Sequence, residues 1–446
     1  MMSTGRCTTS ILAGALVLLS GCAQPRPFDD LWVDVRPYHA EFRPARPPAD
    51  VLQSDATAAK AIKETNPQGA ITLHHAVALA LKQNPTLRAN GWSVAAAEAD
   101  AVQLGKPRNP TATLAIENFG GPERLQELPR QTLRISQVIE LADKRQKRQR
   151  LGEARQRLVA WDYEQQRLEV AAATATRYIA VLVAQERITL TQQQLVLATS
   201  AYDIANERAN NSTRPGFERD QAATRVALIQ IELDQAKESL DSARADLAAS
   251  WGAKQARYEQ VSGDLSLQTD LPTLDTLQQR LPQSPHVARW ADEIELRQRS
   301  VELQRANGVT DPRIGGGVRY LSELDETLGV AEVSWPLPLL DDNEHRILAA
   351  RLRLSQTIAQ QQAANTEASR LLSRAYNRAR TGSKTLTTLR DKAIPAATAA
   401  HQATRKAYEA GQSEYLIALD AERSLLELQL LQLEAAAAYH LSLIHI

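Results

Sequence analysis

Histidine is the residue type in this chain with the clearest capacity to bind a metal ion. The candidates are His74, His75, His286, His345 and His401. A zinc or copper site needs several such donors close together, often two on one helix face. No histidine here has a histidine or glutamate four residues away with a further ligand nearby, and no methionine cluster or cysteine pair accompanies them. We therefore interpret them as surface residues, and the sequence predicts no metal site, no cofactor and no catalytic residue.

The composition favours long helices over a compact enzyme. The chain has 446 residues, 52 Lys and Arg against 52 Asp and Glu, 2 Cys and only 4% aromatic residues. Zero net charge gives no reason to expect a nucleic-acid partner. Two cysteines cannot form a disulfide framework, and no glycine-rich phosphate loop is present. Alanine, leucine, glutamine, arginine and glutamate dominate, as in coiled coils.

The N-terminus predicts export and lipidation. Arg6 precedes the apolar run Ile11 to Leu19, which is too short to span a bilayer as a finished helix. The sequence Leu19-Ser20-Gly21-Cys22 resembles a bacterial lipobox, whose cysteine is acylated and becomes the mature N-terminus. We expect residues 1–21 to be a signal peptide and Cys22 to carry lipid. An ordinary signal peptide with a chance cysteine is the alternative.

Residues 22–70 are expected to form a strap between the lipid and the folded body. Six prolines lie between Gln24 and Pro48. Because proline fixes φ and removes a hydrogen-bond donor, this stretch should be extended and non-helical.

The last six residues, 441–446, read Leu-Ser-Leu-Ile-His-Ile. A common transposon-end sequencing adapter encodes this hexapeptide when it is translated. We therefore expect the segment to be an artefact of sequence assembly, and we infer no role for it.

The remaining chain contains one pattern twice, in residues 71–265 and 266–440. Asn84-Pro85 and Ser284-Pro285 are 200 residues apart, and so are Asp220 and Asp420. Each half predicts a helix, two short strands, a very long helix, a turn and a further helix. The very long helices, about 143–209 and 342–409, would each extend on the order of 100 Å. Their apolar residues recur at spacings of three and four, as in a coiled coil or a helical barrel.

Four short segments alternate apolar and polar residues. They are 111–117, 131–138, 314–320 and 331–335. Such alternation is typical of outer-membrane strands that face lipid on one side and a wet lumen on the other. Four strands cannot close a barrel around an aqueous channel, so several chains must contribute. The sequence therefore predicts an oligomer.

At this point the chain resembles the TolC-like outer membrane efflux family. The strongest match is Tyr408 to Ser413 followed by Leu419-Asp420-Ala421, which is similar to the family's Y-x-x-G turn and the helix after it. Within the family, residues 135–141 with the basic residues after them, and residues 333–341, resemble the heavy-metal branch. That branch includes the outer-membrane subunit of cobalt–zinc–cadmium resistance.

The resemblance implies a mainly α fold with a small β part. It implies a homotrimer with a twelve-stranded barrel in the outer membrane, four strands from each chain, continuing into an α-helical tunnel across the periplasm. It also implies a periplasmic adaptor and an inner-membrane, proton-driven RND pump as partners, contact with outer membrane lipid, and no nucleic acid. The chain would supply the exit duct for heavy-metal cations and do no covalent chemistry.

The resemblance also assigns roles near the turns at 210–216 and 410–415, which would form the periplasmic tip. The expected contacts with the adaptor are Asn211, Pro215, Gly216, Gly411 and Ser413. The expected gate residues are Asp420, Ile417, Asp220, Tyr408 and Arg208. A ring of carboxylates would attract cations, while tyrosine and arginine could join neighbouring helices. The alternatives are a solvated helix acid for Asp420 and core packing for Tyr408.

Two other functions stay open on the sequence. A duct for organic drugs would have the same fold, because the substrate is normally selected in the inner-membrane pump. A non-conducting periplasmic scaffold belongs to a different class, and it would have no need for four alternating strands.

Overall fold

The computed structural model describes residues 66–118, 129–211, 216–267, 271–322 and 324–444. The expected signal peptide, Cys22, most of the strap and Pro215 lie outside these residues. Within the described ranges, no helix is both long enough and apolar enough to cross a membrane.

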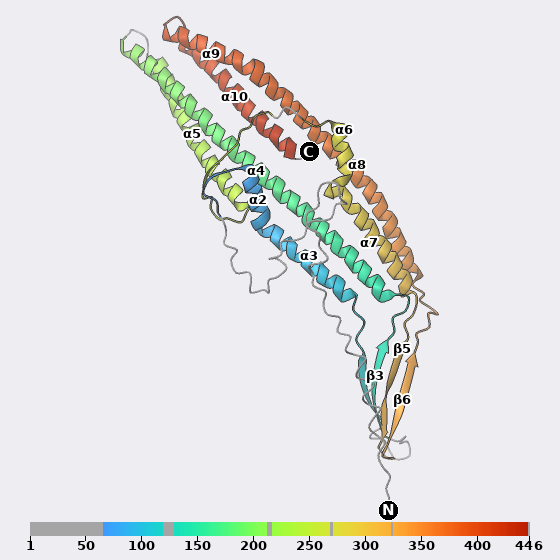
Figure 1. The fold of residues 1–446 in the computed structure, drawn as a ribbon. Helices are drawn as coiled ribbons and strands as arrows, with labels where there is room; N and C mark the ends of the chain where they lie inside the picture. Colours follow the sequence, from blue (N-terminus) through green and yellow to red (C-terminus); the bar gives the residue numbers. More distant parts are fainter. Residues whose placement is uncertain (1–65, 119–128, 212–215, 268–270, 323, 445–446) are drawn as a thin grey trace, which may run out of the picture. The chain divides into compact units, whose positions relative to one another are not determined.

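The two halves of the chain contain the same order of elements (Figure 1). The first half has α2 (Leu73–Gln83), α3 (Pro85–Leu104), β2 (Thr111–Glu117), β3 (Arg130–Val138), α4 (Lys144–Asn211) and α5 (Phe217–Ala249). The second half has α6 (Leu274–Arg280), α7 (Pro285–Asn307), β5 (Arg313–Leu321), β6 (Glu326–Ser334), α8 (Glu344–Thr388), α9 (Ile394–Glu409) and α10 (Tyr415–Ile444). The predicted mainly α fold with an internal repeat is therefore confirmed, and α2 and α6 are additional helices.

The repeated Asn/Ser-Pro pair begins a helix in each half. Pro85 and Pro285 occupy the first turns of α3 and α7, where a missing backbone N–H costs nothing. The Asn84 side chain also accepts a hydrogen bond from the Leu87 N–H at 3.0 Å, which caps α3. The repeated pair therefore marks a helix start through its proline in both halves, and through a side-chain cap in the first half.

The two very long helices differ from each other. Helix α4 is continuous over 68 residues. The prediction of a single helix over about 342–409 is wrong, because a π-helical turn at Leu389–Ala393 separates α8 from α9. Pro395 follows this turn and has no N–H to donate, so the hydrogen-bond ladder has to change its spacing there.

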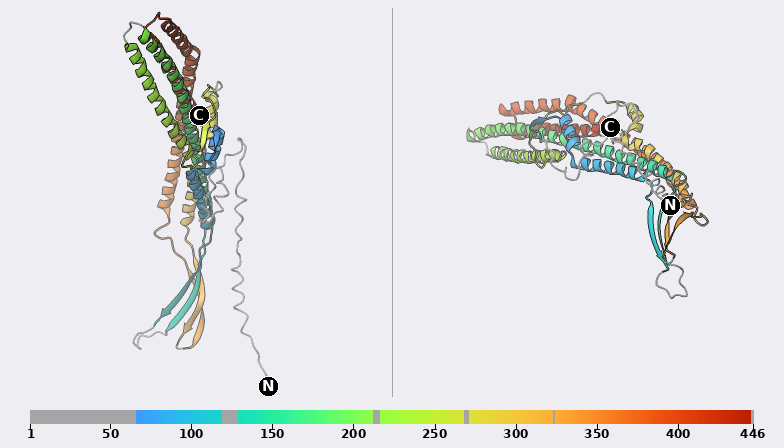
Figure 2. Two further views of the ribbon diagram at one scale, coloured as in Figure 1. Left: turned by 90° about the vertical axis from the view of Figure 1, so that its left-hand side faces the viewer. Right: turned by 60° about the horizontal axis from the view of Figure 1, so that its bottom comes forward.

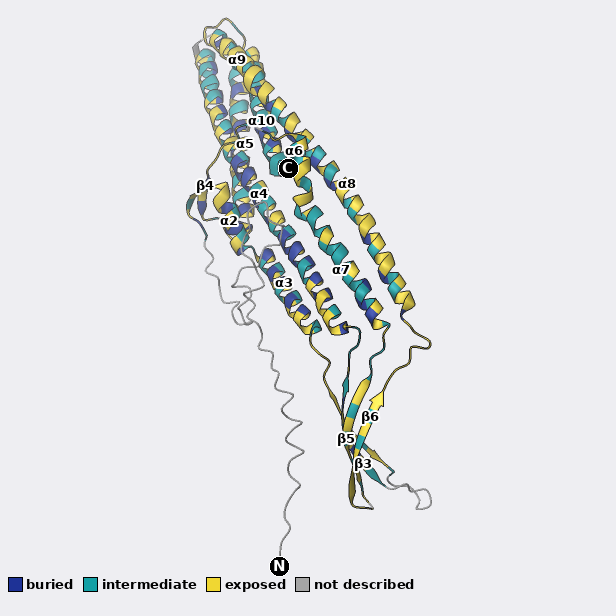
Figure 3. Ribbon diagram, turned by 45° about the vertical axis from the view of Figure 1, so that its right-hand side comes forward, coloured by how far each residue is buried: buried dark blue, intermediate teal, exposed yellow. Residues whose placement is uncertain are grey.

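The four predicted strands form one antiparallel sheet in the order β2-β3-β5-β6. The β2–β3 hairpin of the first half is therefore joined to the β5–β6 hairpin of the second half by the pairing of β3 with β5. Much of the sheet is exposed (Figure 3), and the strand register places many of its exposed apolar side chains on one face. They include Leu114, Ile116, Leu133, Ile135, Ile314, Val318 and Val333, each at least half exposed. The predicted alternation is confirmed, although the opposite face also carries apolar residues, among them Val138, Leu321, Leu328 and Val330.

A small parallel pair joins the start of the first repeat to its end. Strand β1 (Gly69–Ile71) pairs with β4 (Tyr258–Val261), so the last residues of the expected strap belong to the folded body. Tyr258, the first residue of β4, is buried in one cluster with Trp251 and with Tyr178 of α4. Strands of three and four residues are too short to show a period in the sequence, and their partners are distant in the chain.

A buried ion pair fixes the junction between sheet and helices. Lys144, the first residue of α4, contacts Asp311 at 2.6 Å and also donates to the Val309 carbonyl. Their side chains are only 5% and 12% exposed. Ala142 and Asp143, just before α4, both have φ of +55°. This strained turn and the ion pair connect β3 to α4 and join both to the segment that leads into β5. The sheet extends from one end of the long helices (Figure 2).

We predict that Lys144→Met destabilises the chain by about 3–5 kcal/mol, because it leaves the buried Asp311 carboxylate without its cation. Urea unfolding in detergent, followed by circular dichroism, measures the effect. Lys237→Met is the matched control, since Lys237 pairs with Asp234 on an exposed surface and should change stability by less than about 1 kcal/mol. Equal losses in the two variants would contradict a structural role for the buried pair.

Candidate functional site

The candidate site lies where α4 and α9 end and where α5 and α10 begin. Helix α9 ends because Gly411 adopts φ of +78°, a conformation that favours glycine. The Gly411 N–H donates to the Tyr408 carbonyl at 2.9 Å, and the Gln412 N–H donates to the Ala407 carbonyl at 2.8 Å. The glycine of the Y-x-x-G motif is thus a helix-terminating residue.

The tip is held together by a small aromatic core. Tyr408 and Tyr415 are 2% and 3% exposed, and their ring centroids are 5.6 Å apart. Ala205 of α4 and Ala222 of α5 complete the cluster. The Tyr408 ring is therefore part of a packed core, which is the alternative considered for this residue in the sequence analysis. Four helices from two regions of the chain about 200 residues apart therefore meet at this core.

Arg208 and Tyr408, which the sequence paired as gate residues, are in direct contact. The Arg208 guanidinium donates to the Tyr408 carbonyl and, at 3.4 Å, to the Glu409 carbonyl. Its central carbon is 4.3 Å from the centroid of the Tyr408 ring. Arg208 therefore caps the C-terminus of α9 and adds a cation–π contact, which connects the ends of α4 and α9.

The proposed gate acids are exposed rather than packed in the core. The Asp220 side chain is 69% exposed and forms an ion pair with Arg219 at 2.9 Å. Asp420 is also exposed, and Ile417 is 52% exposed. Within the described part of the chain, no three His, Cys, Asp or Glu side chains are placed to hold a metal ion. In a single chain, these acids are therefore available to solvent or to another molecule.

The residues expected to contact an adaptor lie on the turns that end these helices. Asn211 ends α4 and Gly216 precedes α5, while Gly411 and Ser413 lie between α9 and α10. Gly411 is exposed and Ser413 half-buried. The structure thus brings the expected turns to the same helix ends as the gate candidates.

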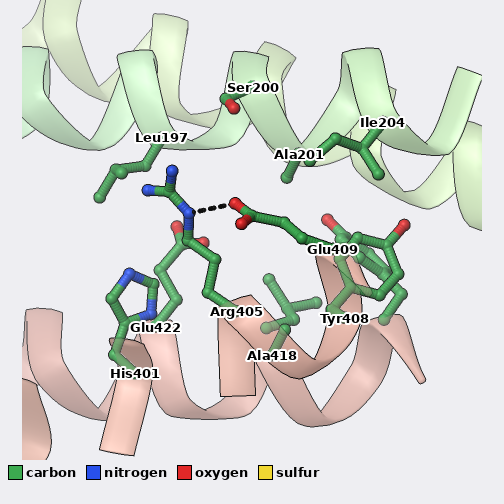
Figure 4. A pocket seen from close by; sticks show the side chains of 12 residues that line it. Leu197, Ser200, Ala201, Ile204, His401, Arg405, Tyr408, Glu409, Ala418 and Glu422 are labelled. Atoms are coloured by element: carbon green, nitrogen blue, oxygen red, sulfur yellow. Dashed lines mark hydrogen bonds and ion pairs between the residues drawn. The ribbon is translucent and has the colours of Figure 1, made fainter. Parts of the chain in front are cut away.

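A pocket between α4, α9 and α10 contains two titratable groups that the sequence did not single out for this site (Figure 4). His401 is 8% exposed, so the expectation of a surface histidine is wrong at this position, whereas the other four histidines are exposed. Its Nδ1 and the Glu422 Oε1 are buried without a hydrogen-bond partner among the described residues. Arg405, on the same pocket wall, pairs with Glu409 at 2.7 Å.

Burial dominates the titration of this pocket. It lowers the pKa of His401, and the nearby Arg405 guanidinium lowers that pKa further. Burial raises the pKa of the Glu422 carboxyl, although Arg225, Arg423 and Arg405 oppose the shift. It also raises the pKa of Tyr415 to about 12. The packed tip therefore prefers the neutral forms of both Glu422 and His401.

The sequence profile of one family, described as "Outer membrane efflux protein", matches residues 76–253 and 276–446. The chain belongs to this family of outer membrane efflux proteins.

Curated relatives of this outer membrane efflux protein carry metal-resistance names. The cobalt-zinc-cadmium resistance protein CzcC of Cupriavidus metallidurans is 27% identical over 378 residues, which cover 84% of this chain and 89% of the relative. The nickel-cobalt-cadmium resistance protein NccC of Alcaligenes xylosoxydans xylosoxydans is 27% identical over 303 residues, 68% of each chain.

Solved structures of outer-membrane channels share the fold. The CusC channel superposes with a TM-score of 0.71 at 16% identity, covering 84% of this chain and 90% of CusC. The outer-membrane channel OprN gives a TM-score of 0.70 at 18% identity, with 90% and 96% covered. VceC from Vibrio cholerae gives 0.69 at 19% identity, with 84% and 95% covered.

We predict that Glu422→Gln tightens the tip at neutral pH. Because the pKa of Glu422 is raised in the packed state, packing is favoured below its ordinary value of 4.5 and loses that stabilisation as pH rises through the raised pKa. The amide removes the cost of a buried carboxylate, so amide hydrogen exchange in α9 and α10, corrected for intrinsic rates, should slow at pH 7.5.

The gain should disappear below about pH 4.5, where the native carboxyl is protonated in both states. Glu427→Gln is the control, since Glu427 is an exposed carboxyl on the same helix. Faster exchange in Glu422→Gln at neutral pH would contradict this account of the pocket.

Proposed function

We propose that this protein is the outer-membrane channel subunit of a tripartite, proton-driven efflux system that exports heavy-metal cations. The observation that carries the proposal is the four-stranded sheet, which has an exposed apolar face and two open edges. Family membership and the metal-resistance names of CzcC and NccC support the choice of function and of cargo.

The open edges support a homotrimer. Among the described residues, β2 and β6 each pair on one side only, so their outer backbone groups need partners if the sheet lies in lipid. Pairing β6 of one copy with β2 of the next supplies those partners. Three copies of a four-stranded sheet give twelve strands, enough to enclose a wet lumen. A non-conducting scaffold would leave the exposed apolar face without a purpose.

The helix tip is proposed as the periplasmic end of the duct. The turns with Asn211, Pro215, Gly216, Gly411 and Ser413 would contact a periplasmic adaptor, which in turn would join an inner-membrane RND pump. Asp420, with Asp220 and Ile417, would surround the opening, since all three side chains are free of the aromatic core. Arg208 and Tyr408 would hold α9 against α4 through their direct contact.

Lipid on Cys22 would add a second attachment to the outer membrane. The lipobox-like sequence before it supports this part of the proposal. A lipid chain buries many methylene groups, so it would hold the protein near the membrane while the barrel assembles.

Growth of a deletion strain on zinc, cadmium, cobalt, nickel, copper and silver, beside a panel of dyes and antibiotics, tests the cargo. The proposal predicts sensitivity confined to metals, with resistance restored by the intact gene. A Cys22→Ser gene should restore resistance less fully, because it retains the barrel and loses the lipid. Sensitivity confined to organic compounds would overturn the metal assignment and leave a duct for drugs.

A further inference from the structure

The face of the sheet opposite the apolar one is lined with arginines. The strand register places Arg130, Thr132, Arg134 and Ser136 of β3 on this face. It places Arg313, Gly315, Gly317 and Arg319 of β5 beside them. If the apolar face meets lipid, this face lines the lumen.

Two of the three glutamates on this face pair with arginines. Glu117 of β2 pairs with Arg130 at 3.1 Å. Glu332 of β6 pairs with Arg134 of β3, although β5 lies between their strands. The intervening strand has glycines at 315 and 317, so no side chain blocks the arginine on its way to the carboxylate.

Two arginines on the same face have no such counter-charge. Arg319 Nε donates to the Thr132 hydroxyl at 3.1 Å, and an Arg313 Nη donates to the Ser136 hydroxyl at 3.4 Å. Thr132 and Ser136 are only 5% and 6% exposed, consistent with guanidinium groups lying over them. Among the described residues, neither arginine forms an ion pair.

Glu326, at the hairpin end of β6, is the acid on this face that has no arginine partner in the described part of the chain. The face therefore carries four arginines against three glutamates, and the excess comes from Arg313 and Arg319. Arg313 and Arg319 are six residues apart along β5, a distance of roughly 20 Å.

We propose that Arg313 and Arg319 make the barrel lumen attractive to small inorganic anions. The inference rests on the proposed trimeric duct, in which each arginine would recur in three copies as a ring. An exit needs weak binding, because cargo that lodges on the wall does not leave. Glu117 and Glu332 cannot serve as metal ligands while arginines occupy them, and the positive rings draw in the anions that accompany the exported charge.

Reversal potentials of the reconstituted full chain in planar bilayers, under a KCl gradient, test the inference. Arg313→Gln/Arg319→Gln should lower the chloride-to-potassium permeability ratio about twofold or more, and the change should shrink at high salt. Arg313→Lys/Arg319→Lys keeps the charge and should retain the native ratio. Arg370→Gln is the control, because Arg370 lies on α8 and pairs with Glu367.

An unchanged ratio in the double glutamine variant at low salt would overturn the inference while leaving the duct in place. A native chain that gives no conductance would overturn the proposed duct, and this inference with it. If the double glutamine variant does not assemble, the single variants Arg313→Gln and Arg319→Gln decide the question, each with a smaller shift in the same direction.

Discussion

The backbone hydrogen bonds along the outer edges of β2 and β6 are the constraint on which the rest of the structure depends. A strand in lipid has no water to satisfy its exposed N–H and C=O groups, so an open sheet cannot remain alone there. The sheet of this chain has an apolar face suited to lipid and two edges without partners. In the proposed assembly, closure by further copies of the same chain would satisfy both edges at once and would also enclose the polar face.

Contacts within the chain fix the helices relative to the sheet. The Lys144–Asp311 ion pair and the turn at Ala142-Asp143 connect the sheet to α4 through a junction with little freedom. From there α4 runs unbroken to the tip, where Arg208 caps α9 and the tyrosine core gathers α4, α5, α9 and α10. The second long helix contains a π-helical turn before Pro395, whereas α4 is continuous, so the two halves differ at this point.

Much of the fold could be predicted because its signals are local and repeated. The prolines at 85 and 285 begin helices, Gly411 ends one, and period-two alternation marks all four long strands. The π-helical turn was missed because Pro395 alone does not show how a helix will accommodate it. The β1–β4 pair was missed because its strands are very short and distant in sequence.

The candidate site was predictable only in part. The match between the halves paired Arg208 with Tyr408, and the two residues are in contact. It could not show that His401 and Glu422 are buried in one pocket, because burial there depends on how α4 packs against α9 and α10. Nor could it show that Arg134 reaches Glu332 across a strand of glycines, a contact that needs the register of three strands.

The number of chains in the detergent-solubilised particle tests the central claim most directly. Light scattering, with the mass of bound detergent subtracted, gives that number for the full chain. The account predicts a particle of three chains, about three times the mass of one chain, which is 49.1 kDa before removal of the expected signal peptide. A stable monomer or dimer would contradict it, because the edges of β2 and β6 would then have no partners that close a barrel.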